Sequence, residues 1–96
     1  MPAYCYFDML EVTDPAKMGK YREGVAATVE KYNGRYLVLN GRHDLVEGDY
    51  RPTFPVLLEF PSLEQAHRWY DSPEYRPLRE LRLSATRGNG VFIEGL

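Results

Sequence analysis

The chain has 96 residues, of which 44% are hydrophobic and 27% are charged, and its formal net charge is −2. This length and composition are typical of a single globular domain, which we expect to span residues 1–96. The slightly negative charge excludes the basic surface that nucleic acids and anionic membranes attract, and no apolar run approaches the roughly 20 residues that cross a bilayer. Because Cys5 is the only cysteine, no internal disulfide is expected and a reducing, cytoplasmic location is predicted.

The first third of the chain predicts a strand followed by a long helix. Residues 3–12 (AYCYFDMLEV) are rich in aromatic and apolar side chains, which favours a strand. Asp14 is a typical helix N-cap, and Pro15 fits the first helical position, where its missing N–H costs nothing. Apolar residues then recur at steps of three and four as far as Asn33-Gly34, a pair that is typical of a helix end.

The rest of the chain predicts three more strands and a second helical region. RYLVLN (residues 35–40) and VLLEF (residues 56–60) read as strands, separated by a loop whose prolines cannot donate to a sheet. Ser62 and Gln65 have the spacing of a capping box, which predicts a helix start. The final strand is predicted at residues 90–95, after a turn made by the glycine-rich segment RGNG.

Two prolines interrupt the second helical region, in the segment HRWYDSPEYRPL. A proline inside a helix removes a backbone donor and crowds the preceding turn. Residues 73–76 are therefore predicted to form one tight turn, with Ser72 as its cap, and a fresh helix is predicted to start at Pro77.

The predicted order is strand, helix, strand, strand, helix, strand, which indicates an α+β, ferredoxin-like βαββαβ fold with a four-stranded antiparallel sheet. Right-handed crossovers place the first and third strands at the sheet centre, and both helical regions on one face. Strand alternation assigns Val56, Leu58 and Phe60 to the helix-covered face, and Leu57 and Glu59 to the opposite face.

The opposite face is not uniformly polar, because it mixes aromatic and aliphatic side chains with carboxylates. Faces of this kind are typical of protein interfaces and ligand pockets. We therefore predict a homodimer in which two sheets pack face to face around a cavity.

Three segments, VTDPAKMGKYREGV, EGDYRP and LLEFPSLEQAHRWYDSPEYRPL, resemble the uncharacterised domain-of-unknown-function family 1330. The resemblance covers nearly the whole chain, and its most specific part is EFPS…A…WYDSPEY. It implies the dimeric α/β-barrel fold, in which two ferredoxin-like subunits pack sheet to sheet, but it implies no reaction. The wider superfamily includes haem-degrading monooxygenases, cofactor-free quinol monooxygenases and lactone isomerases, an analogy that rests on the fold alone.

Carboxylates and histidines within or beside the strands are the candidates for catalysis. An enclosed carboxylate has a raised pKa and could act as a base, whereas a paired or solvated one would be structural. Likewise, a histidine near a cleft could shuttle protons, or could simply be exposed in a loop. The predicted catalytic residues are Glu59, His43 and Asp8, and the predicted ligand contacts are Tyr4, Tyr6, Leu57, Arg51 and Phe92.

Arg76, Arg79 and Arg82 recur every three residues, with Glu74 and Glu80 among them. Such a row could bind an anion, but a solvated helix face that pairs its own charges is the more common structure. The two histidines lack ligand spacing, so neither a metal site nor a cofactor is predicted.

Two functions are consistent with these patterns. The first is a small dimeric enzyme acting on a hydrophobic, oxygenated small molecule, as an isomerase or a cofactor-free oxygenase. The alternative is a non-catalytic dimer that binds a small ligand or stabilises a partner, which the absence of a catalytic triad and of a phosphate-binding loop favours.

Overall fold

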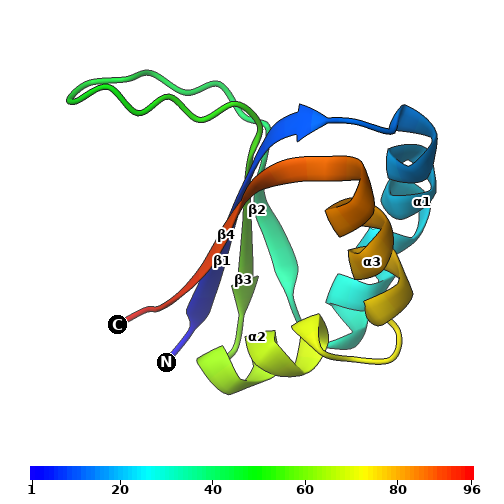
Figure 1. Ribbon diagram of the computed structural model, residues 1–96. Coiled ribbons are helices and arrows are strands. Elements are labelled where there is room, and N and C mark those ends of the chain that lie inside the picture. Colours follow the sequence, from blue (N-terminus) through cyan, green and yellow to red (C-terminus); the bar gives the residue numbers. More distant parts are fainter.

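The computed structural model describes residues 1–96 as a four-stranded antiparallel sheet with all its helices on one face (Figure 1). The elements in chain order are β1 (Ala3–Val12), α1 (Pro15–Lys31), β2 (Arg35–Leu39), β3 (Pro55–Phe60), α2 (Leu63–Tyr70), α3 (Arg76–Ala85) and β4 (Thr86–Glu94). The strand order is β2-β3-β1-β4, so the first and third strands lie at the centre. This confirms the predicted α+β, ferredoxin-like arrangement. None of the helices is both long enough and apolar enough to cross a membrane.

The limits of α1 follow from local sequence signals. The Asp14 carboxylate accepts a backbone N–H of the first turn at 3.2 Å, next to Pro15. At the other end Asn33 adopts a left-handed conformation with φ of 65°, which asparagine tolerates better than most residues. The N–H groups of Asn33 and Gly34 then bond to carbonyls of the last turn at 3.0 and 2.9 Å, as in a Schellman motif.

The start of α2 differs in one detail from the prediction. The Ser62 hydroxyl accepts the Gln65 backbone N–H at 3.0 Å, as a capping box requires. The Gln65 amide, however, donates to the Tyr32 carbonyl at 3.0 Å instead of returning to Ser62. Only half of the capping box forms, because the glutamine links α2 to the end of α1.

The proline-containing break between α2 and α3 is a tight turn, as predicted, and α3 begins at Arg76, one residue before the predicted start. The buried Ser72 hydroxyl donates to the Trp69 carbonyl at 2.7 Å and accepts the Tyr75 N–H at 3.1 Å. The Tyr75 ring stacks on Trp69 with 4.1 Å between ring centroids. The turn therefore places two large aromatic rings in the corner of the core.

The prediction for the last strand was wrong at its start, because β4 begins at Thr86 instead of residue 90. The glycine-rich segment pairs with β1, with Gly88 opposite Met9. A Cβ atom on Gly88 would lie 2.3 Å from the Asp8 carbonyl oxygen, and one on Gly90 would lie 2.8 Å from the Phe7 ring. The glycines thus allow close approach between strands, which sequence reasoning mistook for a turn.

The two faces of the sheet have different environments. The helix-covered face holds the hydrophobic core, which consists of Ala3, Cys5, Val25, Val29, Leu58, Phe60, Ala66, Trp69 and Tyr75. On the open face, Tyr4 lies between Glu59 and Ile93, and Tyr6 lies between Leu57 and Val91. Ile93 and Val91 are 56% and 48% exposed, so apolar surface remains uncovered there.

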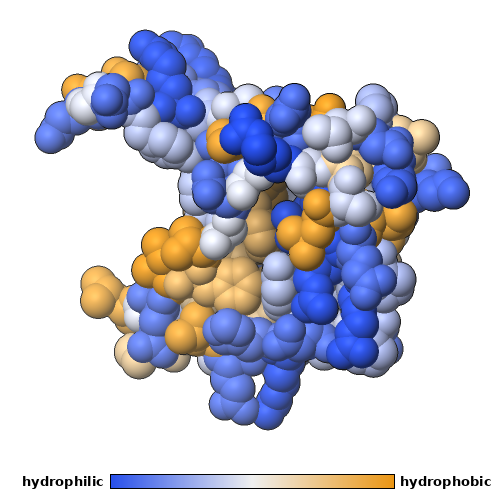
Figure 2. Space-filling model, in the orientation of Figure 1, coloured by the Kyte–Doolittle hydropathy of each residue, from blue (hydrophilic) through white to orange (hydrophobic).

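The segment of residues 40–54 joins β2 to β3 and is named here the arm. It extends from the sheet on the side away from the helices (Figure 1). Hydrophilic residues dominate its surface, whereas hydrophobic residues gather in a hollow between the sheet and the helices (Figure 2). The arm and the open face of the sheet therefore lie on the same side of the molecule.

Candidate functional site

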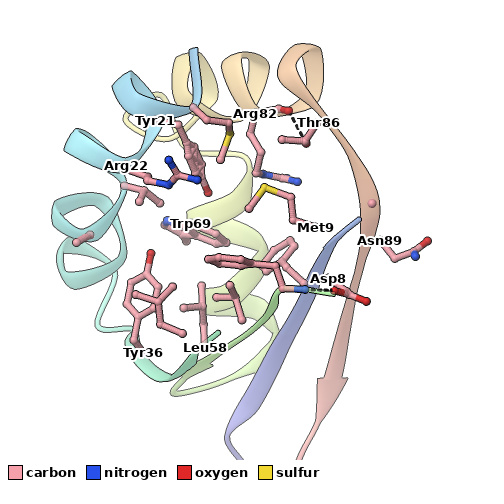
Figure 3. Close-up of a pocket in the computed structure, with 18 residues that line it drawn as sticks. Asp8, Met9, Tyr21, Arg22, Tyr36, Leu58, Trp69, Arg82, Thr86 and Asn89 are labelled. Carbon is pink, nitrogen blue, oxygen red and sulfur yellow. Dashed lines mark hydrogen bonds between the residues drawn. The ribbon is translucent and has the colours of Figure 1, made fainter. Parts of the chain in front are cut away.

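A cavity of about 390 Å³ lies between the sheet and the helices α1 and α3 (Figure 3). Eighteen residues line it, and 12 of them are hydrophobic. This size and this apolar character are typical of small-molecule sites. The cavity lies on the helix-covered face of one chain, whereas the predicted cavity lies between two sheets. The latter requires a second chain and stays a prediction.

Two tyrosines place hydroxyl groups at the cavity. Tyr21, from α1, shares a hydrogen bond of 2.8 Å with the Tyr75 hydroxyl, and burial together with this neighbour raises the pKa of Tyr21. Burial also raises the pKa of Tyr36 to about 12, with a smaller contribution from Tyr75. Both phenols are therefore protonated at neutral pH. The Tyr36 hydroxyl has no hydrogen-bond partner within the chain, so it is free to donate to a ligand.

Two arginines bring positive charge to the cavity. Arg82 extends from α3 into the cavity, and Arg22 reaches it from α1 (Figure 3). The Arg82 Nε donates to the Tyr75 hydroxyl at 3.3 Å, and its guanidinium lies 5.1 Å from the centre of the Phe7 ring. Burial alone would lower the pKa of Arg82, but the hydroxyls of Tyr75 and Tyr21 outweigh it and the pKa is raised. Arg82 is therefore fully charged.

Asp8 is the one predicted catalytic residue that lines the cavity. Its carboxylate is buried and accepts the N–H groups of Phe54 and Thr53 at 2.8 and 2.9 Å and the Tyr50 hydroxyl at 2.7 Å. Burial favours a higher pKa for Asp8, but these three hydrogen bonds outweigh burial and its pKa is lowered. Asp8 is thus an ionised carboxylate whose oxygens are engaged in holding the base of the arm.

The other two predicted catalytic residues lie outside the cavity. Glu59 is on the open face, where its carboxylate accepts the Arg35 Nε at 2.7 Å. His43 is exposed in the arm, with its Nδ1 2.9 Å from the Gly41 carbonyl oxygen. Their catalytic roles stay predictions. No group of three or more His, Cys, Asp or Glu side chains is placed to hold a metal ion.

The predicted ligand contacts also lie outside this cavity. Tyr4, Tyr6 and Leu57 are on the open face, and Arg51 is exposed in the arm. Phe92 points to the helix side and packs edge-on against Tyr70, with 5.6 Å between ring centroids. If the open-face residues contact a ligand, that ligand is bound outside the cavity between the sheet and the helices.

The row of arginines on α3 divides its members between two environments. Arg76 is exposed, but Arg79 is only 19% exposed and pairs with Asp71, at the end of α2, at 3.1 Å. Glu74 pairs with Lys31 of α1 instead of an arginine, so the prediction of a solvated, self-pairing helix face was wrong. Arg82 departs from this prediction and enters the cavity. The sequence held a signal for this, since Arg82 follows Leu78 by four residues and precedes the buried Ala85 by three. That spacing puts it on the inward face of α3.

The family described as "Domain of unknown function (DUF1330)" matches residues 2–96. The chain belongs to this family. No curated protein sequence matches the DUF1330 chain.

Solved structures share the fold of the DUF1330 chain. A protein of unknown function from Rhodopseudomonas palustris has a TM-score of 0.75 at 15% identity, with 99% of this chain and 82% of that chain covered. A dimeric protein of unknown function with a ferredoxin-like fold, from Bacteroides fragilis, has a TM-score of 0.61 at 14% identity, with 98% and 96% covered. SnoaB, a cofactor-independent oxygenase from Streptomyces nogalater, has a TM-score of 0.57 at 14% identity, with 99% and 91% covered. At such identities the likeness establishes the fold alone.

Proposed function

We propose that the chain binds a hydrophobic, oxygenated small molecule in the cavity between the sheet and the helices, and acts on it as a cofactor-free oxygenase or an isomerase. The observation that carries the proposal is the cavity itself, which is mostly apolar but receives a few convergent polar groups. Apolar walls with a small number of oriented donors are the usual design of a small-molecule site. The likeness in fold to a cofactor-independent oxygenase supports the first reaction class.

The groups around the cavity suit chemistry at an oxygen-bearing carbon. The apolar walls, which include Trp69 and Leu58, would exclude water and admit both a flat apolar ring system and O₂. Tyr36 and Arg82 would donate hydrogen bonds to an oxygen on which negative charge develops, which favours enolate formation. In the oxygenase reaction a methylene that is activated by the ligand's carbonyl group loses a proton to water and reacts with O₂. The methylene becomes a carbonyl, and one water is released for each O₂ consumed.

A non-catalytic ligand-binding protein is the second candidate. It is favoured by the state of Asp8, since three hydrogen bonds engage its carboxylate and leave it a poor proton acceptor. Under this alternative the cavity binds its ligand unchanged. Binding and turnover therefore need separate experiments.

Binding is tested with the neutral fluorophore N-phenyl-1-naphthylamine, whose emission rises in apolar sites. Ala26 lines the cavity from an exposed position on α1, and its neighbour Ala27 is also exposed but does not line it. We expect Ala26→Phe to obstruct the cavity and weaken binding by at least about tenfold, a typical effect of a steric clash in a binding pocket. Ala27→Phe is the matched control and should bind as the wild type does. Equal binding by both variants would refute the proposed site.

Turnover is tested by O₂ uptake with anthrone, an enolisable tricyclic ketone, corrected for its uncatalysed oxidation. An oxygenase should consume one O₂ for each anthraquinone formed, and Ala26→Phe should abolish the enzymatic part. Solvent deuterium incorporation without O₂ uptake would support the isomerase class instead. Saturable binding with neither outcome would support the non-catalytic alternative for this class of ligand.

We also propose that two chains associate through the open faces of their sheets. The uncovered apolar side chains Val91 and Ile93 support this, as does the description of the Bacteroides fragilis protein of the same fold as dimeric. The arm extends on that side too and would reach the second chain (Figure 1). A closed two-fold dimer would bury apolar surface that is otherwise exposed to water.

A further inference from the structure

Arg82 has more hydrogen-bonding capacity than the protein uses. A guanidinium carries five N–H donors, and here only the Nε is engaged, with the Tyr75 hydroxyl. No carboxylate lies within ion-pairing distance of Arg82. No fully buried side-chain nitrogen or oxygen lacks a partner, so the two terminal nitrogens are not sealed in the core. They reach the cavity, which Arg82 lines.

The rest of the cavity does not neutralise this charge. Arg22 adds a second guanidinium, which also has no ion-pair partner. Asp8 is the only carboxylate among the lining residues, and its oxygens already accept three hydrogen bonds from the base of the arm. Two cations and one engaged anion leave the lining with a net positive charge.

The terminal nitrogens of Arg82 have no acceptor within the protein, so an anionic ligand in the cavity would supply one. Guanidinium groups bind carboxylates and other oxyanions through parallel N–H donors, and such charge-assisted bonds are the strong ones. The Phe7 ring below the Arg82 guanidinium, at 5.1 Å, holds the side chain in place from the face that a ligand would not use.

We propose that the natural ligand is a hydrophobic organic anion whose oxyanion binds the Arg82 guanidinium. This proposal rests on the proposed function, in that the cavity must bind a small molecule at all, and it adds the charge class of that molecule. The apolar walls hold the hydrophobic part of the ligand, Arg82 holds the oxyanion, and the Tyr36 hydroxyl is available as a further donor.

The wild-type protein tests this with two matched ligands, 1-naphthoate and 1-naphthylmethanol, which share a ring system and differ in charge. Each is titrated near neutral pH against bound N-phenyl-1-naphthylamine. Since a charge-assisted hydrogen bond is worth more than a neutral one, we expect naphthoate to displace the probe at an at least about tenfold lower concentration than the alcohol.

Variants then assign the preference to Arg82. In Arg82→Gln the preference for the anion should fall to nearly none, while affinity for the neutral alcohol is kept. Arg82→Lys, which keeps the charge without the planar fork, should retain part of it and also serves if Arg82→Gln does not fold. The matched control is Arg76→Gln, which removes the same charge from an exposed position of α3 and should leave the preference unchanged.

Two results would overturn the inference. One is equal displacement by naphthoate and the alcohol in the wild type, which would leave the proposed apolar binding site standing. The other is a preference that survives Arg82→Gln but is lost in Arg22→Gln. Failure of N-phenyl-1-naphthylamine to bind would instead remove the proposed function on which the inference rests.

Discussion

On the open face of the sheet Glu59 is paired with Arg35 at 2.7 Å, whereas on the helix-covered face Arg82 reaches a cavity without any carboxylate partner. The open face thus satisfies its charges internally and leaves apolar side chains exposed. The helix-covered face buries its apolar side chains and leaves the charge of Arg82 without an ion-pair partner. Exposed apolar surface of this kind is typical of a contact with another protein. An unpaired charge in a concave, mostly apolar site is typical of a site that binds a small ligand.

The difference between the two faces predicts that the open face is an interface between two chains, and disrupting this interface should have the largest effect. Val91→Lys places a charge in the proposed contact, twice in a two-fold dimer, and should weaken association at least about a hundredfold because buried unpaired charges are so unfavourable. Sedimentation velocity at micromolar concentration should show a wild-type dimer and a variant monomer. Leu83→Lys, on α3 at a position 57% exposed, is the control and should remain dimeric. A wild-type monomer would contradict the proposed assembly.

A second change concerns Asp8, which ties the arm to the sheet. Asp8→Ala would leave two backbone N–H groups, of Phe54 and Thr53, without their acceptor, and should lower the free energy of unfolding by about 3 kcal/mol. Chemical denaturation measures this. Asp49→Ala, at an exposed position of the same arm, should change stability by less than about 0.5 kcal/mol. Similar small effects in both variants would show that Asp8 does not anchor the arm.

The pH dependence of stability gives an independent measure of the same carboxylate. The pKa of Asp8 is lowered in the folded protein, so its contribution to stability is fully present above the unfolded pKa of about 4. That contribution is lost as the pH falls through the lower, folded pKa. Between about pH 5 and pH 2 the wild type should therefore lose stability more steeply than Asp8→Asn. Parallel curves would contradict the role assigned to these hydrogen bonds.

The smallest expected effect is at Glu59, whose charge is paired with that of Arg35, in contrast to the unpaired charge of Arg82. Its ion pair is solvent-exposed on the Arg35 side, at 70% of that side chain, so Glu59→Gln should lower the free energy of unfolding by less than about 1 kcal/mol. Binding of N-phenyl-1-naphthylamine should not change, because Glu59 does not line the cavity. A dimer of Glu59→Gln that folds normally but loses turnover would instead support Glu59 as the base of a site between the sheets.

The elements of the fold were predictable because their signals are local. Asp14 and Pro15 specify the start of α1, and alternation in residues 56–60 specifies which side chains face the helices. The start of β4 was mistaken for a turn because the reason for its glycines is the close approach of β1, a strand about 80 residues away in the chain. The cavity on the helix-covered face was not predicted, and of the predicted catalytic residues only Asp8 is among those that line it. The lowered pKa of Asp8 depends on donors from the distant residues 50–54.

The sequence by itself determined the order of strands and helices, the faces of the sheet and, through Asn33 and Ser72, the helix boundaries. These features depend on φ/ψ preferences, hydrophobic periodicity and hydrogen bonds between near neighbours. Only the tertiary structure decided that Arg82 leaves the charged row of α3 and enters a cavity, and that Asp8 is engaged by the arm. The charge state and availability of a side chain are set by whatever lies within a few ångströms of it, and those neighbours come from elements that are far apart along the chain.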